Sequence, residues 1–260
     1  MSSVVYVKRN VRDVDDVVEA VMERIGVHAA GRVVLKPNLI NEAPPPTTTP
    51  PDIVEALARW FLAEGCEVVV AEGSGWGDTM QAFRKLGYVE LEGSGVKLVD
   101  LNFDSYFVVE NPEAYVLKRF ELPATLKDAY VVSVPVLKEH SITKVTLSLK
   151  NMLGATLGEG RIAKKGRFHR IGLDESIVDV NIHVKPRLAF IDGRTAGIGG
   201  ELSSKPKDVG VIIASKDLVA ADAMGAKILG YDPSSVRHLR LAEEKGIGVA
   251  SLDRVRIVEL

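Results

Sequence analysis

Cysteine is almost absent from this chain. Cys66 is the one cysteine among 260 residues. It cannot form a disulfide within the chain, and it cannot supply the four thiolates of an iron–sulfur cluster. This composition is typical of a protein in a reducing compartment, so we expect the cytosol. Glutamine also occurs once, at Gln81, and scarcity of such thermolabile side chains is typical of thermophiles.

Long apolar runs are absent as well. No stretch approaches the roughly 18 apolar residues of a membrane span, and the first residues, MSSVVYVKRN, lack the apolar segment of a signal peptide. A net charge of −2 argues against a protein coated in basic charge for nucleic acid. We therefore expect neither a membrane nor a nucleic acid as partner.

The familiar catalytic motifs are missing. There is no GxSxG, HExxH or GxxxxGK[ST] segment, and GSGWGD at 73–78 only approaches the GxGxxG spacing. No nucleophile scheme can therefore be assigned from local motifs.

Strand and helix patterns alternate along much of the chain. Buried strands are predicted at 32–35, 67–71, 130–135, 187–191 and 210–215, and helices at 13–25, 53–63, 173–184, 218–229 and 234–245. A strand at 4–7 begins the chain, and 255–258 is predicted as an edge strand. This alternation predicts an α/β fold with a mostly parallel central sheet flanked by helices, in one domain covering residues 1–260.

Two segments depart from the alternation. Strand patterns at 96–101, 106–109 and 115–120 have no helix-length segment between them, which predicts an antiparallel β insertion around residues 96–120. Residues 141–153 fit either a strand or a helix. We favour the helix, because a buried strand followed by a loop usually leads into a crossover.

Polar side chains follow several predicted strands at the point where each strand ends. Lys36 and Asn38, Glu72 and Ser74, Lys138 and His140, and Asp192 all hold this position. The loop after the second strand also brings Thr47 and Thr48 to the start of a helix. In open α/β sheets ligands bind off the carboxyl ends of strands, so we expect these groups to form a site for a small anion.

A basic segment runs from Lys138 to Arg170. It holds eight Lys or Arg residues against two acids, Glu139 and Glu159. Its part at 154–168 is rich in glycine and is predicted to be an exposed loop that closes over a ligand.

Two kinds of chemistry are open at the predicted site. His140 and His169 are candidates for a general base or a metal pair, although a lone histidine is more often structural. Glu72 with Asp192 would suit a divalent cation such as Mg²⁺, although both fit equally well as helix caps and turn formers. No cofactor can be named from these residues.

The chain resembles an uncharacterised family known as domain of unknown function 362. The matching segments are VVLKPNLI, TTTPPDIVEAL, VVVAEGSG, VPVLKEHSITKVTLSLKNMLGA, the basic loop ending in FHR, AFIDG and IIASKDLVAADAMGAKILGYDP. The resemblance implies a shared site at Lys36, Asn38, Glu72, Lys138, His140, Lys150, Asn151 and His169. Relatives in this family are often joined to ferredoxin-type iron–sulfur modules. This sequence has no CxxC run, so the resemblance implies no cluster in this chain.

Two hypotheses follow. In the first, the chain is an enzyme acting on a small anionic substrate. Lys36, Lys138 and Lys150 would hold the anion, Thr47, Thr48, Asn38, Ser74 and Asn151 would orient it, and His140, His169 or Lys150 would carry the chemistry. In the second, the chain is a non-catalytic partner of an iron–sulfur or redox protein, and its basic loop docks an acidic surface. A closed pocket favours the first, and an open basic surface favours the second.

Overall fold

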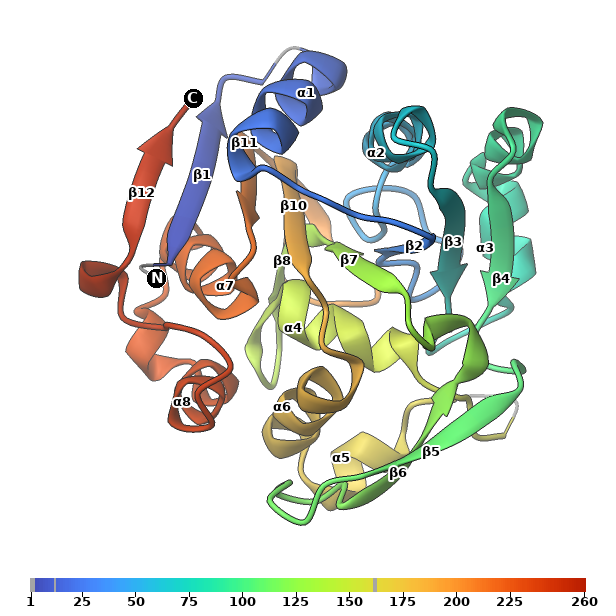
Figure 1. Ribbon diagram of the computed structural model, residues 1–260. Helices are drawn as coiled ribbons and strands as arrows, with labels where there is room; N and C mark the ends of the chain where they lie inside the picture. The colour runs from blue at the N-terminus through green and yellow to red at the C-terminus, as the bar shows by residue number, and fades with distance from the viewer. Residues whose placement is uncertain (1–2, 12, 161–162) are drawn as a thin grey trace.

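A computed structural model describes residues 3–11, 13–160 and 163–260. Within them, one sheet is built from β1 (Val4–Arg9), β2 (Arg32–Pro37), β3 (Glu67–Glu72), β4 (Lys97–Asp100), β7 (Tyr130–Val134), β8 (Val136–His140), β9 (Lys144–Thr146), β10 (Leu188–Ile198), β11 (Lys205–Ser215) and β12 (Arg256–Glu259). The strand order is β12-β1-β11-β10-β7-β2-β3-β4, and β8 pairs with β10 and β9 (Figure 1).

The central part of the sheet is parallel. Strands β10, β7, β2, β3 and β4 run in one direction, while β11 is antiparallel to both β10 and β1. The prediction of a mostly parallel sheet is confirmed, and β12 is an edge strand as expected. The chain passes from β2 outward to β3 and β4, and then returns to β7 on the other side of β2. The strand order therefore reverses between β2 and β7, which is where ligands bind in such sheets.

Helices cover both faces of the sheet (Figure 1). They are α1 (Val14–Ile25), α2 (Pro51–Ala63), α3 (Thr79–Lys85), α4 (Ser148–Asn151), α5 (Arg167–Ile171), α6 (Leu173–Val184), α7 (Leu218–Ile228) and α8 (Arg237–Glu244), with short 3₁₀ helices η1 (Tyr88–Ser94), η2 (Ala124–Leu126), η3 (Met152–Ala155), η4 (Pro233–Ser235) and η5 (Leu252–Arg254).

Alternate strand residues divide between two apolar cores. Val33 and Leu35 pack with α1, α2 and α3, whereas Val34 packs into the core that contains α6, α7 and α8. The period of two along a strand sends neighbouring side chains to opposite faces, so a continuously apolar strand can serve both cores. Among the described residues, no helix combines the length and the apolar character needed to cross a bilayer.

The predicted antiparallel insertion is confirmed in part. Strands β5 (Tyr106–Glu110) and β6 (Arg119–Pro123) form a separate antiparallel pair. The strand predicted at 96–101 is instead β4, which pairs in parallel with β3 because α3 and η1 provide the crossover. The strand predicted at 115–120 begins later, at Arg119. The Asp179 carboxylate accepts hydrogen bonds from three consecutive N–H groups, those of Tyr115, Val116 and Leu117, which removes them from any strand ladder.

The helix predicted over 141–153 is wrong for most of its length. Strands β8 and β9 form a hairpin, and α4 begins only at Ser148. The buried Asp222 carboxylate accepts the N–H groups of Ser148 and Leu149, both at 2.8 Å, and so starts the helix there. Lys138 and His140 consequently lie within strand β8 rather than in a loop after a strand.

Asp222 should be essential to the position of α4. Replacement by alanine leaves two buried N–H groups without an acceptor, so we expect Asp222→Ala to lower the free energy of unfolding by about 3 kcal/mol. Urea denaturation would measure this. Asp253→Ala, at an exposed position, is the control and should change stability by less than about 0.5 kcal/mol. Equal effects of the two substitutions would contradict the role assigned to Asp222.

Candidate functional site

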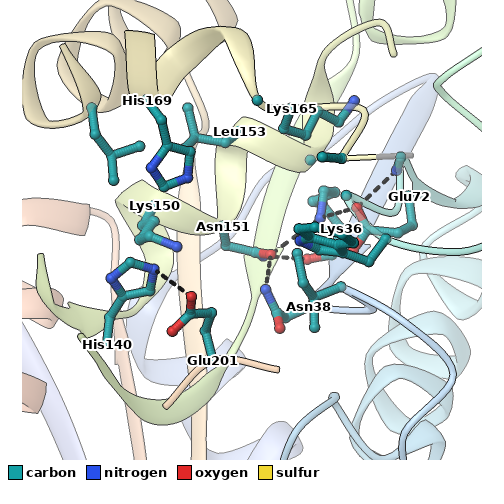
Figure 2. Close-up of a pocket in the computed structure, with 18 residues that line it drawn as sticks. Lys36, Asn38, Glu72, His140, Lys150, Asn151, Leu153, Lys165, His169 and Glu201 are labelled. Atoms are coloured by element: carbon teal, nitrogen blue, oxygen red, sulfur yellow. Dashed lines mark hydrogen bonds and ion pairs between the residues drawn. The ribbon is translucent and has the colours of Figure 1, made fainter. Parts of the chain in front are cut away.

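A pocket lies at the carboxyl ends of β2 and β3, close to the point where the strand order reverses. Its volume is ≈ 110 Å³, which suits a small molecule. Helices α4 and α5 and the loop between β10 and β11 supply its other walls (Figure 2). Its polar lining consists of Lys36, Asn38, Glu72, His140, Lys150, Asn151, Lys165, His169 and Glu201.

A buried ion pair joins the ends of β2 and β3. Lys36 Nζ lies 2.7 Å from Glu72 Oε1, and the two side chains are 1% and 3% exposed. Lys36 also donates to the carbonyl of Pro37 at 2.6 Å and to Asn151 Oδ1 at 3.1 Å. Burial lowers the pKa of Lys36, and Glu72 opposes this shift. Because all three ammonium protons are engaged, Lys36 has no donor left for a ligand.

Asn151 fastens α4 to the sheet. Its Oδ1 accepts from Lys36 and, at 3.3 Å, from Asn38 Nδ2. Its Nδ2 donates to the carbonyl of Lys36 at 2.8 Å and to Ser133 Oγ at 3.1 Å. The side chain thus connects α4 with β2 and β7. It fixes the end of α4, the helix that carries the neighbouring Lys150.

Lys138 is also fully engaged. Its Nζ donates to Asn38 Oδ1 at 3.1 Å, to the carbonyl of Thr47 at 2.7 Å and to the carbonyl of Glu201 at 3.1 Å. Burial, together with the charge of Lys150, lowers the pKa of Lys138 to about 7. Lys138 therefore holds two loops together behind the pocket.

Lys150 differs from these lysines. It is half-buried and its side chain reaches into the pocket (Figure 2). Within residues 3–11, 13–160 and 163–260, its ammonium has no hydrogen-bond or ion-pair partner. Burial lowers the pKa of Lys150 to about 8, although Glu201 and Asp174 oppose the shift. Lys150 is thus a pocket amine with its donors available.

His140 is held in one tautomer. Its Nδ1 accepts the N–H groups of Ile142 and Thr143, both at 3.1 Å, so the proton sits on Nε2. That nitrogen lies 3.6 Å from Glu201 Oε1. Burial, with the charge of Lys150 adding to it, lowers the pKa of His140 to about 2. His140 is therefore a neutral donor facing the pocket.

His169 lies opposite His140, on α5. Figure 2 shows the Lys150 side chain between the two rings, with Glu201 below. His169 is partly open to solvent, yet burial lowers its pKa, and the charge of Lys150 lowers it further. The two histidines, Lys150 and Glu201 form one side of the pocket, and the Lys36–Glu72 pair forms the other.

Three lining residues of importance were not predicted. Glu201 lies in the loop between β10 and β11, where no strand end or motif marks it. Lys165 donates to Asn102 Oδ1 at 2.8 Å and to the carbonyl of Thr156 at 2.5 Å, which leaves one donor. Gly154 has no room for a side chain, because a Cβ there would lie 2.2 Å from Glu72 Oε1. The sequence shows that this segment is rich in glycine, but it does not show that Gly154 packs against Glu72.

Several predicted site residues do not line the pocket. Thr47 accepts from the N–H of Ser204, and Thr48 donates to the carbonyl of Ala43. Ser74 Oγ donates to the carbonyl of Leu39 at 2.6 Å. These groups close loops around the site.

Glu72 and Asp192 are not placed together for a metal ion. They line different pockets, since Asp192 lies within β10 rather than after a strand. Both oxygens of Asp192 accept from Arg194, and both oxygens of Glu72 accept from protein donors. Among the described residues, no group of three or more His, Cys, Asp or Glu side chains could hold a metal ion.

The model of a family called domain of unknown function (DUF362) matches residues 33–227. The chain belongs to this family. The resemblance carried by the KPN and LKNMLG segments is thereby confirmed, and all of the polar lining falls within the DUF362 range. The chain is also similar to Thylakoid-associated protein sll1697 of Synechocystis sp. The two are 26% identical over 229 residues, which cover 85% of this chain and 70% of that protein.

Removing the negative charge of Glu72 should destabilise the fold. Glu72→Gln keeps the shape of the side chain but leaves the Lys36 charge buried and unpaired, so we expect a loss of about 3–5 kcal/mol in the free energy of unfolding. The matched control is Glu67→Gln at the start of the same strand, where the pairs with Arg32 and Lys97 are exposed. That change should cost much less, because water screens exposed ion pairs. Similar losses of unfolding free energy for the two variants in urea denaturation would contradict the stabilising role assigned to the buried pair.

Proposed function

We propose that this chain is an enzyme that acts on a small substrate bearing a carboxylate or phosphate group. The observation that carries the proposal is the contrast among the pocket lysines. Lys36 and Lys138 donate all their protons to protein acceptors. Lys150 donates to no acceptor in the described part of the chain and stands between two histidines. Because no protein acceptor among the described residues occupies its donors, this amine can donate hydrogen bonds to a bound ligand.

The pocket can both bind an anion and move a proton. Lys165 has one donor left and Asn38 one amide proton, so these groups and Lys150 can hold the anionic group. His140 presents an N–H at Nε2, and His169, which is neutral when its pKa is lowered, can accept a proton. The proposed roles are therefore binding by Lys150, Lys165 and Asn38, hydrogen bonding to the substrate by His140, and proton transfer by His169.

The contacts of the basic segment favour this proposal over docking of an iron–sulfur protein. Lys164 is 4% exposed and donates to the carbonyl of Gly77 at 2.7 Å. Arg167 donates to Glu159 and stacks over Phe168. These side chains are engaged within the fold, while Arg161 lies outside the described residues. An acidic partner would find few of the predicted charges available.

Small anions should stabilise the protein through Lys150. In a thermal-shift screen of sulfate, phosphate and malonate, we expect an effective anion at 100 times its Kd to add about 2.7 kcal/mol. Lys150→Ala should abolish the shift and His140→Ala should reduce it, while the exposed control Lys118→Ala should respond like the parent. An undiminished response of Lys150→Ala would refute the proposal.

Anion binding should also depend on pH. The ammonium form of Lys150 attracts the anion, and deprotonation near pH 8 removes that charge. Affinity for sulfate should therefore be constant at lower pH and fall by up to about tenfold per pH unit above about pH 8. Calorimetric titration would measure this. Lys150→Arg keeps its charge to much higher pH, so its affinity should stay level. A level profile in the parent would argue against a role for the Lys150 charge.

A further inference from the structure

The lack of a hydrogen-bond partner for the Lys150 amine among the described residues indicates which class of substrate the pocket would take. An amine whose three N–H groups donate to protein oxygen atoms is held toward those atoms and away from a substrate. Lys36 and Lys138 are in this state, and Lys165 already donates twice. Lys150 alone among these four has no acceptor within the described residues. It is therefore the pocket amine that can react as a nucleophile.

The surroundings of Lys150 suit one reaction of amines. Condensation of an amine with a carbonyl group needs a neutral amine, a proton donor for the departing hydroxyl group and space for the water that leaves. Burial of the ammonium provides the first, because it favours the neutral amine. For the second, His169, on the other side of Lys150 (Figure 2), can carry the proton, and the Nε2–H of His140, whose nitrogen lies 3.6 Å from Glu201 Oε1, can donate a hydrogen bond to the departing oxygen. The water can leave through the opening of the pocket beside the exposed His169.

We infer that the substrate carries a carbonyl group beside its anionic group, as a 2-oxo acid does, and that Lys150 condenses with this carbonyl to form an imine. This inference rests on the proposed function, because it assigns the anionic group to the same pocket. The carboxylate would meet the remaining donors of Lys165 and Asn38. Trp76 and Ile40, which also line the pocket, would contact the carbon chain.

The reaction balances without a further reactant. The lone pair of Lys150 Nζ forms a bond to the carbonyl carbon, and the carbonyl oxygen takes up a proton to give a carbinolamine. The C–O bond then breaks, and the hydroxyl group leaves as water after receiving a second proton. The nitrogen of the C=N bond loses its remaining proton, so the two protons of the amine account for the two protons of the water. A histidine or Glu201 that gives a proton in one step regains it from the amine in the other.

Reductive trapping tests the inference. Glyoxylate with sodium borohydride converts an imine at lysine into a carboxymethyl amine, which peptide mass spectrometry locates. At about pH 8 roughly half of Lys150 is neutral, against well under about 1% of an exposed lysine. We expect Lys150 to be labelled roughly tenfold or more faster than the exposed Lys118. Lys118→Arg should leave labelling at Lys150 intact, and Lys150→Arg should remove it.

The outcomes separate this inference from the proposed function. Preferential labelling at Lys150 supports the imine. Labelling of Lys150 no faster than that of Lys118, with Lys150-dependent stabilisation by sulfate retained, overturns the imine and leaves the proposed function standing. Absence of both preferential labelling and stabilisation by sulfate, phosphate or malonate overturns both.

Discussion

The buried pair between Lys36 and Glu72 is the interaction on which the rest of the site depends. Two charges removed from water are tolerated only when further hydrogen bonds satisfy them, and here those bonds come from the surrounding chain. Glu72 accepts the N–H groups of Leu39 and Gly73, and Lys36 donates to Asn151. The pair thereby fixes the segment after β2, the turn after β3 and the end of helix α4. A glycine is required at Gly154 because its backbone passes directly over this pair.

This arrangement divides the lysines of the site into two groups. Lys36 and Lys138 hold strands and loops together through hydrogen bonds to protein acceptors. Lys150 directly precedes Asn151 in α4, so its position is determined by Asn151 and by the Asp222 carboxylate at the start of the helix. Burial lowers its pKa to about 8, although Glu201 and Asp174 oppose the shift. The fold thus supplies a positioned amine, on which the proposed function depends.

Much of this could be predicted from sequence, and the remainder depends on contacts between distant segments. Continuously apolar stretches such as residues 32–35 identify central strands, and Lys36 and Glu72 follow from their places at the strand ends. Hydrogen-bond occupancy is not visible in a sequence, so Lys36, Lys138 and Lys150 appear equivalent there. The helix expected over 141–153 fails because Asp222, some seventy residues away in the chain, decides where α4 begins. Glu201 was not predicted, because it lies in an irregular loop whose sequence has neither helical nor strand periodicity.

The most direct test is the ionisation of the Lys150 amine in the free protein. Carbon-13 NMR of the lysine ε-methylene groups, with the Lys150 signal assigned by comparison with Lys150→Arg, follows each amine through a pH titration. We expect a midpoint at about 8 for Lys150 and ordinary values near about 10.4 for exposed lysines. An ordinary midpoint for Lys150 would mean that its amine is solvated or paired, and would contradict the role proposed for Lys150.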